Sequence, residues 1–501
     1  MGAPTAPPSK GDGLTSVAWE GTIRFNMSAK AGRRNHDCVV HDGRLVNVFG
    51  RWARTVEEIY LPQLLGGQPA AWWSAWLHSK LGANKTGKEV RPQQGLANCN
   101  HIVAVPLQVG AGETELWLPC GFEGDRVGKE ESTRVTRIVN LTTLEVRKGP
   151  RIAQAGGACA ALALPVGRQG EESLQVCAIG GTDGTHNSGR FLDSMRCFSR
   201  ASGEWHEPAQ RLPFALDHAN AVLIPAGTCA RGDPPRVLLM NFRTQHYSNE
   251  RTEILALDLG EAAGSRTAGA GAAMRGASHR RIGARARRGM RAPWYLYAND
   301  SNSLPRDAGG IVLAAGGRAV LNFGGVYYAQ TESKAAAAAF FDRELKGRLA
   351  GVEVARPKSP HSLRVSRGAD YKGTRWQTRL IFSEVRAFDV CTSRRWFPIA
   401  QLEFGRYALQ SCASGSHTFT CGGFGRNGRC DGLKENCRSC DVHSKPQLEK
   451  AALAAFDAHR HREERARRRR LAEEDGGASA TAAAVSVPTT VQGRVLARFG
   501  F

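Results

Sequence analysis

The chain has 501 residues, of which 42% are hydrophobic and 23% are charged, and its 68 lysines and arginines against 46 acidic residues give a formal net charge of +22. An apolar fraction of this size is normal for a globular chain, so global disorder is excluded. A membrane span is excluded as well, because no window offers the about 18 consecutive apolar residues that a spanning helix needs. The excess of positive charge leaves nucleic acid as a partner class to be tested.

The start of the sequence lacks the charged and then apolar pattern of a secretory signal. We therefore expect an intracellular protein, in the cytoplasm or the nucleus. The cysteines fit this location, since nine of the thirteen are scattered singly. Several of them, Cys38, Cys159, Cys177 and Cys197, lie inside apolar runs, where a free thiol packs as a small hydrophobic group.

A repeated pattern of short apolar runs organises most of the chain. Its clearest copy, residues 175–224, has the order QVCAIGG (175–181), a polar loop (182–190), MRCFS (195–199), a turn with Trp205, and HANAVLIP (218–225). Short β-rich runs divided by Gly, Pro, Asn and Asp turns predict an antiparallel meander of four strands. The first strand recurs at 38–40, 102–105, 158–164, 221–224, 311–315 and 411–415, and the second at 45–50, 116–121, 176–181, 237–242, 319–325 and 417–423.

These repeats resemble the kelch-repeat family, whose blades also occur in galactose-oxidase-like propellers. The residues that carry the resemblance are Gly180-Gly181 with Trp205 and Arg211, Gly324-Gly325, and Asp389 with Trp396, Arg406 and Cys421-Gly422-Gly423. The resemblance covers about residues 20–430 and implies an all-β fold, a kelch-type β-propeller with six blades, or with seven. It also implies a role in protein–protein interaction.

The remaining segments are expected to lie outside the propeller, which we place at residues 16–430. We expect a disordered N-terminus (1–15), a disordered Ala/Gly/Arg-rich insertion (about 261–292), and a further insertion (about 335–378). A Cys-rich segment (431–445), a basic helix (446–475) and a linker (476–501) follow. Residues 16–25 and 491–501 both read as strands that could complete one blade and close the ring, and the sequence does not choose between them.

The positive charge is concentrated in three stretches. Residues 275–291 carry +7, residues 343–379 carry +7, and residues 459–470, with seven arginines and two glutamates, carry +5, which together make +19 of the +22. The propeller strands are therefore nearly neutral. The tail 459–470 is either a polyanion-binding or nuclear-localisation tract or simply a solvated helix end, and nucleic acid is expected as a partner only through it.

An arginine precedes the first strand of each repeat. These residues, which could ring one mouth of the channel, are Arg34, Arg91, Arg151, Arg211, Arg306 and Arg406. Guanidinium groups suit carboxylate or phosphate capture, but arginines in such positions also tie neighbouring blades to backbone carbonyls. We prefer the structural role for most of them. The set of candidate binding residues adds loop residues near the same face: Asp183, His186, Asn187, Arg190, His218, Arg243 and Arg426.

Two patterns suggest metal ligands. Asn35-His36, Asn100-His101 and Asp217-His218 stand at the start of three first strands, so three imidazoles could point to one axis, although such residues more often satisfy backbone groups. Cys430, Cys437, Cys440 and His443 form C-x6-C-x2-C-x2-H, which is either a small zinc knuckle or a set of ordinary thiols or a disulfide.

The sequence has no G-x-S-x-G, P-loop, H-E-x-x-H or Rossmann motif, and no Cys–Tyr set of the kind that galactose-oxidase-like copper chemistry needs. We therefore expect a monomeric, non-catalytic module without a cofactor, which binds a protein partner, an acidic peptide for instance, through loops on one face. The alternative is an enzyme or small-ligand-binding protein with its site in the propeller mouth.

Overall fold

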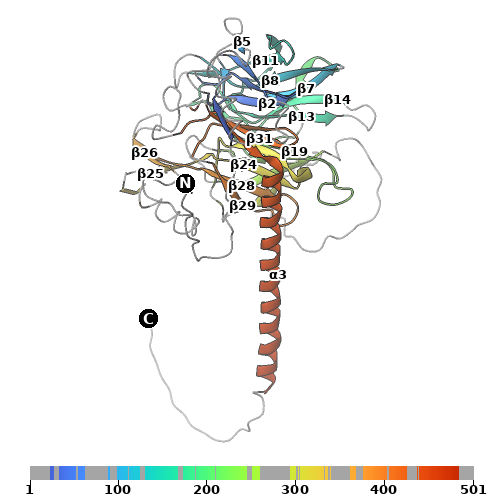
Figure 1. Cartoon of the computed structure of the whole chain (residues 1–501), viewed down its shortest axis with the longest axis vertical. Helices are drawn as coiled ribbons and strands as arrows, with labels where there is room; N and C mark the ends of the chain where they lie inside the picture. The colour runs from blue at the N-terminus through green and yellow to red at the C-terminus, as the bar shows by residue number, and fades with distance from the viewer. Residues whose placement is uncertain are drawn as a thin grey trace, which may run out of the picture. The chain divides into compact units, whose positions relative to one another are not determined.

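The structure is a computed structural model of the chain. It describes residues 23–26, 33–51, 55–61, 89–90, 99–110, 112–124, 130–166, 173–186, 188–208, 210–244, 251–259, 294–300, 305–331, 362–367, 376–402, 405–425, 437 and 439–483, together with residues 303, 333, 335, 336 and 339. The chain divides into two compact units, Met1–Ala452 and Leu453–Phe501. All strands in the described residues belong to the first unit (Figure 1).

Six of the sheets in the described part of the chain have four antiparallel strands each. In the order in which their strands pair, they are β2 (Asp37–His41), β3 (Arg44–Val48), β4 (Val56–Tyr60) and β5 (Glu89–Val90); β7 (Val105–Gly110), β8 (Glu113–Leu118), β11 (Val135–Asn140) and β12 (Val146–Arg151); β13 (Ala160–Val166), β14 (Ser173–Ile179), β17 (Met195–Ser199) and β18 (Glu204–His206); β19 (Asn220–Ile224), β20 (Arg236–Met240), β21 (Glu253–Asp258) and β22 (Tyr295–Asn299); β23 (Gly310–Ala314), β24 (Ala319–Phe323), β28 (Glu384–Asp389) and β29 (Trp396–Gln401); and β30 (Gln410–Ala413), β31 (His417–Cys421), β32 (Ser439–Ser444) and β1 (Ile23–Asn26).

Three smaller sheets join the ends of these. They are β6 (Cys99–Asn100) with β9 (Phe122–Glu123) and β10 (Glu131–Ser132); β15 (Thr182–Asp183) with β16 (Arg190–Phe191); and β25 (Val326–Thr331) with β27 (Trp376–Ile381) and β26 (Ser362–Arg367). A 3-10 turn, Ala315–Gly317, links β23 to β24. Strand β26 lies in the segment 335–378 that we expected to be an insertion, and β27 begins in it.

The hydrophobic core lies between the faces of successive sheets. The second strands are buried along most of their length, as in the run Val237, Leu238, Leu239 and Met240 of β20. A strand that is covered on both faces needs a continuous apolar run, and this is how the sequence of β20 reads. The first strands β2 and β30, β23 and β30, β13 and β19, and β7 and β13 are in contact with one another. These features define an all-β, propeller-like fold, which confirms that part of the prediction.

The first strand along the chain completes the last four-stranded sheet. β1 pairs antiparallel with β32, from Ile23↔Val442 to Asn26↔Ser439. Of the two predicted closing segments, 16–25 therefore overlaps the strand that pairs here, while 491–501 lies outside the described residues. The last sheet also extends beyond the predicted boundary at residue 430, because β32 is formed by part of the segment that we assigned as Cys-rich.

A series of backbone hydrogen bonds joins the loops that lead into the first strands. Six residues at equivalent positions have a left-handed backbone, with φ between 50° and 54°: Asn35, His101, Ala158, His218, Ala308 and Ala408. Their amides and carbonyls form a chain of N–H···O bonds, Asn35 to Ala408 (2.9 Å), His101 to Asn35 (2.8 Å), Ala158 to His101 (3.2 Å), His218 to Ala158 (2.7 Å) and Ala408 to Ala308 (2.7 Å). The repeats that the sequence predicts thus share one backbone geometry around a common centre.

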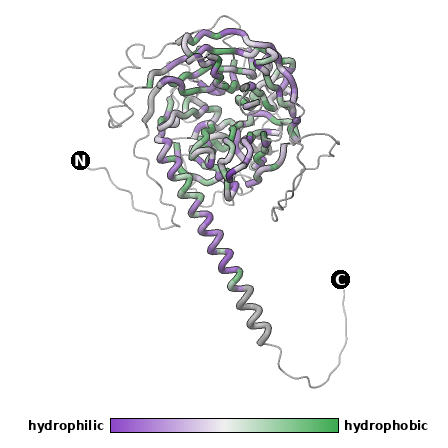
Figure 2. Tube along the Cα trace, turned by 90° about the vertical axis from the view of Figure 1, so that its right-hand side faces the viewer, coloured by the Kyte–Doolittle hydropathy of each residue, from purple (hydrophilic) through white to green (hydrophobic). Residues whose placement is uncertain are grey.

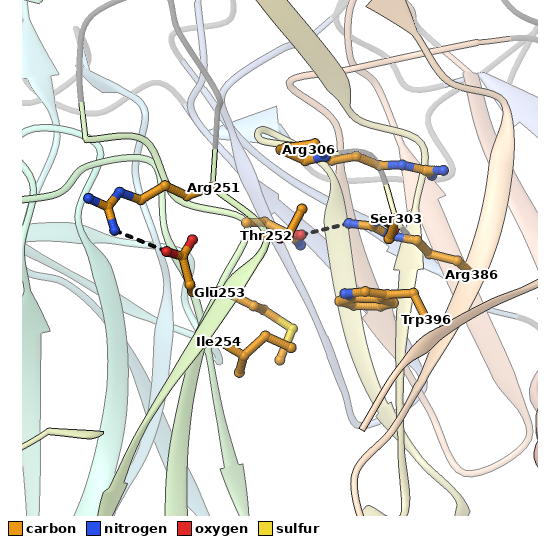
Figure 3. Close-up of a pocket in the computed structure, with 11 residues that line it drawn as sticks. Arg251, Thr252, Glu253, Ile254, Ser303, Arg306, Arg386 and Trp396 are labelled. Carbon is orange, nitrogen blue, oxygen red and sulfur yellow. Dashed lines mark hydrogen bonds and ion pairs between the residues drawn. The ribbon is translucent and has the colours of Figure 1, made fainter. Parts of the chain in front are cut away.

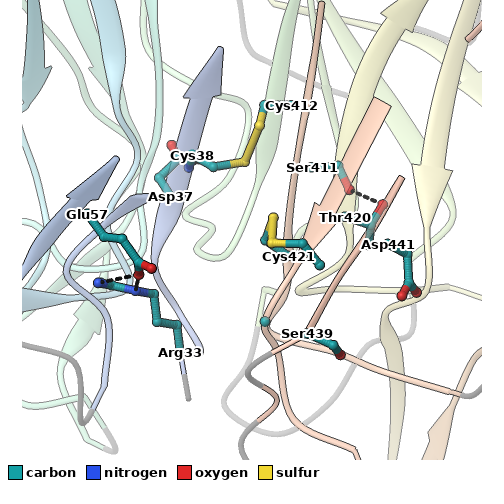
Figure 4. The surroundings of a disulfide bond; sticks show 12 residues. Arg33, Asp37, Cys38, Glu57, Ser411, Cys412, Thr420, Cys421, Ser439 and Asp441 are labelled. Atoms are coloured by element: carbon teal, nitrogen blue, oxygen red, sulfur yellow. Dashed lines mark hydrogen bonds and ion pairs between the residues drawn. A yellow bond between two sulfur atoms is a disulfide. The ribbon is translucent and has the colours of Figure 1, made fainter. Parts of the chain in front are cut away.

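Most of the described cysteines are disulfide-bonded, contrary to the expectation from their scattered spacing. Five disulfides with both partners among the described residues join Cys38 to Cys412, Cys120 to Cys159, Cys177 to Cys197, Cys229 to Cys391 and Cys421 to Cys440. Single cysteines far apart in the sequence meet because the fold brings their strands together, as Figure 4 shows for Cys38 of β2 and Cys412 of β30. Among the described cysteines, Cys99 alone is free, and it is buried.

One long helix, α3 (Lys445–Ala483), follows the last sheet. Much of its part in the second unit is hydrophilic (Figure 2), and residues 460–473 are exposed. No helix in the described residues is long and apolar enough to cross a membrane. The predicted disordered segments 1–15 and about 261–292 lie outside the described residues, as does the linker beyond residue 483.

Candidate functional site

Several of the arginines that we placed on a binding face are buried in ion pairs. Arg406 is fully buried, donates to the backbone oxygens of Gly422 (3.3 Å) and Ser439 (3.2 Å), and pairs with Asp441. Arg306 pairs with Glu384 (2.6 Å) and lies 3.8 Å above the Phe382 ring. These two residues stabilise loops and sheets, so their assignment to a binding face is wrong, and the alternative structural role holds for them.

The other predicted arginines lie in different surroundings. Arg211 is exposed and pairs with Asp193 (3.1 Å) and Glu207 (3.4 Å). Arg34 is half-buried, with its guanidinium 5.1 Å from the centre of the Phe424 ring. Arg151 and Arg190 are exposed at the ends of β12 and β16. Arg91, Asn187 and Arg426 lie outside the described residues.

Sequence reasoning missed four further buried arginines, and these are fixed by internal hydrogen bonds. Arg33 donates to Phe49 O (2.8 Å) and Thr55 O (2.9 Å) and pairs with Glu57 (Figure 4). Arg137, Arg196 and Arg386 are equally buried. Arg137, Arg196 and Arg386 lie inside the strands β11, β17 and β28, and Arg33 is next to the predicted Arg34. To find them, the repeats would have to be aligned without an error of even one residue.

Arg386 also lines a small pocket, which Figure 3 shows. Its guanidinium lies 4.1 Å above the Trp396 ring and donates to Ser303 Oγ (2.7 Å) and Asn241 Oδ1 (2.9 Å). Burial lowers the pKa of Arg386 well below its usual value, and Arg306 lowers it further. Arg386 therefore uses its N–H groups in hydrogen bonds to the protein, and few of them remain for a ligand in this pocket.

Three histidines converge where the loops into two first strands meet the loop that follows the Gly180-Gly181 pair. They are His101, His186 and His218, whose candidate ligand atoms all lie within 4.8 Å of one another. The Nε2 atoms of His101 and His186 are 3.1 Å apart, and the ring centres of His101 and His218 are 5.1 Å apart. Phe122 stands against this group, with its ring centre 5.0 Å from that of His186.

Polar groups orient two of these rings. His101 Nδ1 lies 2.5 Å from Asn100 Oδ1, and His218 Nδ1 lies 2.9 Å from Asp217 Oδ2. Burial lowers the pKa of His101 well below its usual value, and the neighbouring His186 and His218 lower it further. His101 is therefore a neutral imidazole with one nitrogen turned toward the cluster.

Arg243 is the cation beside the histidines, and two carboxylates balance it. It donates to both oxygens of Asp217 (3.1 and 3.0 Å), and its Nε lies 3.3 Å from Asp307 Oδ2. Its Nη2 is 2.5 Å from His218 Nδ1 and 3.2 Å from His218 Nε2. Arg243 is itself buried, so it belongs to the interior of this site and is not an exposed anchor for a partner as we predicted.

Of the three histidines that could point to one axis, His101 and His218 converge and His36 does not, although the sequence favoured a backbone-satisfying role for all three. His36 is fully buried and follows Asn35, which is the residue in the left-handed position that His101 and His218 occupy in their repeats. A shift of one residue turns the side chain from the centre of the ring into the core. The third imidazole comes instead from His186, in the predicted binding loop Thr182–Arg190.

A second feature on the same side of the sheets is a hollow of about 390 Å³. Its lining includes Arg134, Arg151, Glu131 and Asp183. Arg134 and Arg151 are exposed, and neither forms an ion pair with any residue that the structure describes. The hollow adjoins the histidine loop, because His186 N donates to Glu130 O (2.9 Å) and Gly184 N donates to Ser132 Oγ (2.9 Å).

The zinc knuckle predicted from C-x6-C-x2-C-x2-H is not formed. Cys440 is bonded to Cys421 across two paired strands, and Cys437 is also disulfide-bonded. A thiol in a disulfide is not available as a thiolate ligand. His443 is buried and stacks 5.7 Å from the Phe323 ring, and Cys430 lies outside the described residues.

No family model matches the sequence, and no curated protein matches it either. Among solved structures, the chain is similar to the structure of YjhT, with 9% sequence identity and a TM-score of 0.47. This likeness covers 82% of the chain and 94% of YjhT.

Proposed function

We propose that the chain is a six-bladed, kelch-type β-propeller that acts as a non-catalytic binding module for an acidic peptide segment of a protein partner. Six four-stranded sheets and six equivalent left-handed residues support the blade number. The repeated Gly-Gly turns, such as Gly180-Gly181 with φ of 63° and 102°, support the kelch type.

The observation that carries the binding proposal is the pair of exposed arginines on the 390 Å³ hollow, Arg134 and Arg151. Most other arginines of the sheets already have carboxylate or carbonyl partners, whereas these two have no ion pair among the described residues. An arginine without a partner at the rim of a hollow offers bidentate hydrogen bonds to an incoming carboxylate. Asp183 and Glu131 on the same lining favour a peptide with some neutral or basic positions over a uniformly acidic one.

The test is the binding of labelled decapeptides rich in Asp and Glu, measured by fluorescence anisotropy on the full chain. The double variant Arg134→Glu/Arg151→Glu is expected to weaken binding by about tenfold or more, which corresponds to about 1.4 kcal/mol. The matched control is Arg231→Glu, an exposed arginine in the turn between β19 and β20, at the opposite end of the strands. Equal binding by the wild type and the double variant, or equal loss in the control, would overturn the proposal.

A location in the cytoplasm or the nucleus remains a prediction, and its support from the cysteines is lost. Five disulfides are typical of proteins that fold in an oxidising environment and are rare in reducing compartments. Mass mapping of the native protein without reductant, after purification from its own cells, would show whether the pairs form there.

A further inference from the structure

We propose that His101, His186 and His218 form a binding site for a divalent transition metal of the zinc class. This site goes beyond the peptide-binding role and does not depend on it, and it replaces our expectation that the chain carries no cofactor. The three residues come from three separate loops, so the fold itself assembles the group.

The distances fit imidazole ligands around one ion. Two imidazole nitrogens bound to a tetrahedral zinc at its usual bond length lie about 3.3 Å apart. The Nε2 atoms of His101 and His186 are 3.1 Å apart, and the candidate ligand atom of His218 lies within 4.8 Å of both. The ion would therefore require only a small movement of the His218 ring or of the loop that carries His186.

The surroundings of the histidines match those of metal-bound imidazoles. A ligating histidine usually donates its other ring N–H to a carboxylate or a carbonyl oxygen, which fixes the tautomer and turns the lone pair toward the metal. Asn100 Oδ1 occupies this place at His101 Nδ1 (2.5 Å). Asp217 Oδ2 lies 2.9 Å from His218 Nδ1, but Arg243 Nη2 lies 2.5 Å from the same nitrogen, so His218 can donate to Asp217 only when Arg243 gives up this contact.

The local charge also admits a cation. Arg243 contacts the His218 ring and would repel a metal ion if it stood alone. It is paired with both Asp217 and Asp307, however, so these three groups carry one net negative charge. Arg51, which also faces His101, is neutralised by its ion pair with Glu130.

The backbone leaves the choice of side chain open at these positions. His101 and His218 have φ of 53°, a left-handed conformation that Asn, Asp and His adopt more often than other residues with a side chain. Ala158, Ala308 and Ala408 occupy this position in other repeats, so the shared backbone geometry does not itself require histidine.

Three protein ligands leave a fourth position, because zinc with three histidines completes a tetrahedron with water or with an oxygen of a bound molecule. Phe122 covers one side of the histidines. A metal in this place would therefore present one open coordination site at the end of the channel that bears the hollow.

The test uses Zn²⁺, with Co²⁺ as its spectroscopic substitute, on the full chain purified with a chelator and without a histidine tag. We expect one Zn²⁺ per chain by titration calorimetry, and a visible d–d absorption of tetrahedral Co²⁺ that Zn²⁺ displaces. His186→Ala is expected to weaken Zn²⁺ binding by at least about tenfold. The control His206→Ala changes an exposed histidine of β18, in the sheet that the His186 loop joins, and should leave the affinity unchanged.

Thermal unfolding of both variants without metal separates loss of the site from loss of the fold. No binding of Zn²⁺ by the folded wild type would overturn the proposal, as would binding that His186→Ala leaves intact, which would place the metal on the histidines of α3. Peptide binding is measured in the chelated protein, so its failure and the failure of metal binding are distinguishable.

Discussion

Cys38 and Cys412, which are 374 positions apart in the sequence, form a disulfide between the first strands of the first and the last four-stranded sheets. β2 and β30 are in contact there, and β1 completes the last sheet by pairing with β32. The joint between the two ends of the propeller is thus closed twice, by hydrogen bonds at the outer edge and by a covalent bond near the centre.

The double variant Cys38→Ala/Cys412→Ala is expected to lower the free energy of unfolding by about 2–5 kcal/mol, because the bond closes a very long loop in the unfolded chain. The matched control is Cys177→Ala/Cys197→Ala, which opens a loop of only 20 positions and should cost less. Denaturant unfolding of the oxidised proteins measures both values. A larger loss in the control would contradict the loop argument.

Acid should destabilise the protein through His36. The ring is fully buried, its two nitrogens have no hydrogen-bond partner among the described residues, and burial and Arg33 lower its pKa to about 3. In the unfolded chain His36 takes up a proton near pH 6.5, whereas in the folded chain it stays neutral until about pH 3. The free energy of unfolding is therefore unaffected by His36 above pH 6.5. It decreases by up to about 1.4 kcal/mol per pH unit as the pH falls from 6.5 toward 3.

His36→Leu removes this contribution, since a leucine needs no hydrogen bond and takes up no proton. We expect the free energy of unfolding of the variant to decrease less than that of the wild type between pH 6 and pH 4. Urea unfolding at a series of pH values measures this difference. The same slope in the variant and the wild type would show that other groups cause the acid loss.

Arg406 and Arg211 occupy similar positions in the repeats, but their replacement by alanine should change the free energy of unfolding by very different amounts. Arg406→Ala leaves Asp441 buried without its partner and is expected to cost about 3–5 kcal/mol of stability. Arg211→Ala removes ion pairs that are exposed and should cost less than about 1 kcal/mol. Chemical denaturation of the two variants checks this, and similar losses would refute the distinction between a buried and a surface role.

Close packing at a glycine turn can be separated from backbone strain by comparing two glycines. Gly422 has φ of 60°, and a Cβ there would lie 2.4 Å from Arg33 O, whereas Gly43 has φ of 67° and nothing within 4 Å. Gly43→Ala is expected to cost only the strain of about 1–2 kcal/mol, and Gly422→Ala more than that. Equal changes in melting temperature would mean that the chain relaxes around the added methyl group.

The arginines of residues 459–470 should account for any binding to polyanions. They lie on α3, and residues 460–470 are exposed, so the charge is available to phosphate or sulfate groups. Deletion of 459–470 is expected to lower the salt concentration at which the chain elutes from heparin and to leave its melting temperature unchanged. Unchanged elution would show that the first unit binds the polymer.

The sequence was sufficient to predict the first and second strands of the four-stranded sheets because each repeat carries its own signals. The apolar run of β20 and the Gly180-Gly181 pair can be read locally, without knowing what they contact. Residues 439–444 were misassigned because the Cys-x-x-Cys spacing dominated the interpretation. In the structure, Cys440 lies in a strand between β31 and β1.

The candidate site was only partly predictable because it depends on which side chains the fold brings together. His101 and His218 could be found from their repeat position, but His36 differs from them by a single residue of register. His186 has no repeat signal at all, since it lies in a loop of one repeat only. Disulfides between residues such as Cys38 and Cys412 are equally invisible, because sequence spacing does not determine spatial distance.

The pairing of β1 with β32 has a consequence for biosynthesis. A ribosome releases β1 early and β32 only after the other described strands, so the last sheet cannot be completed until most of the chain has been made. Until then β1 has no partner, and the edge of a half-built ring is open to other strands. A chaperone, or rapid pairing of β1 with β32, would protect that edge. We expect that removal of β1 leaves β32 without its partner and increases the fraction of aggregated protein.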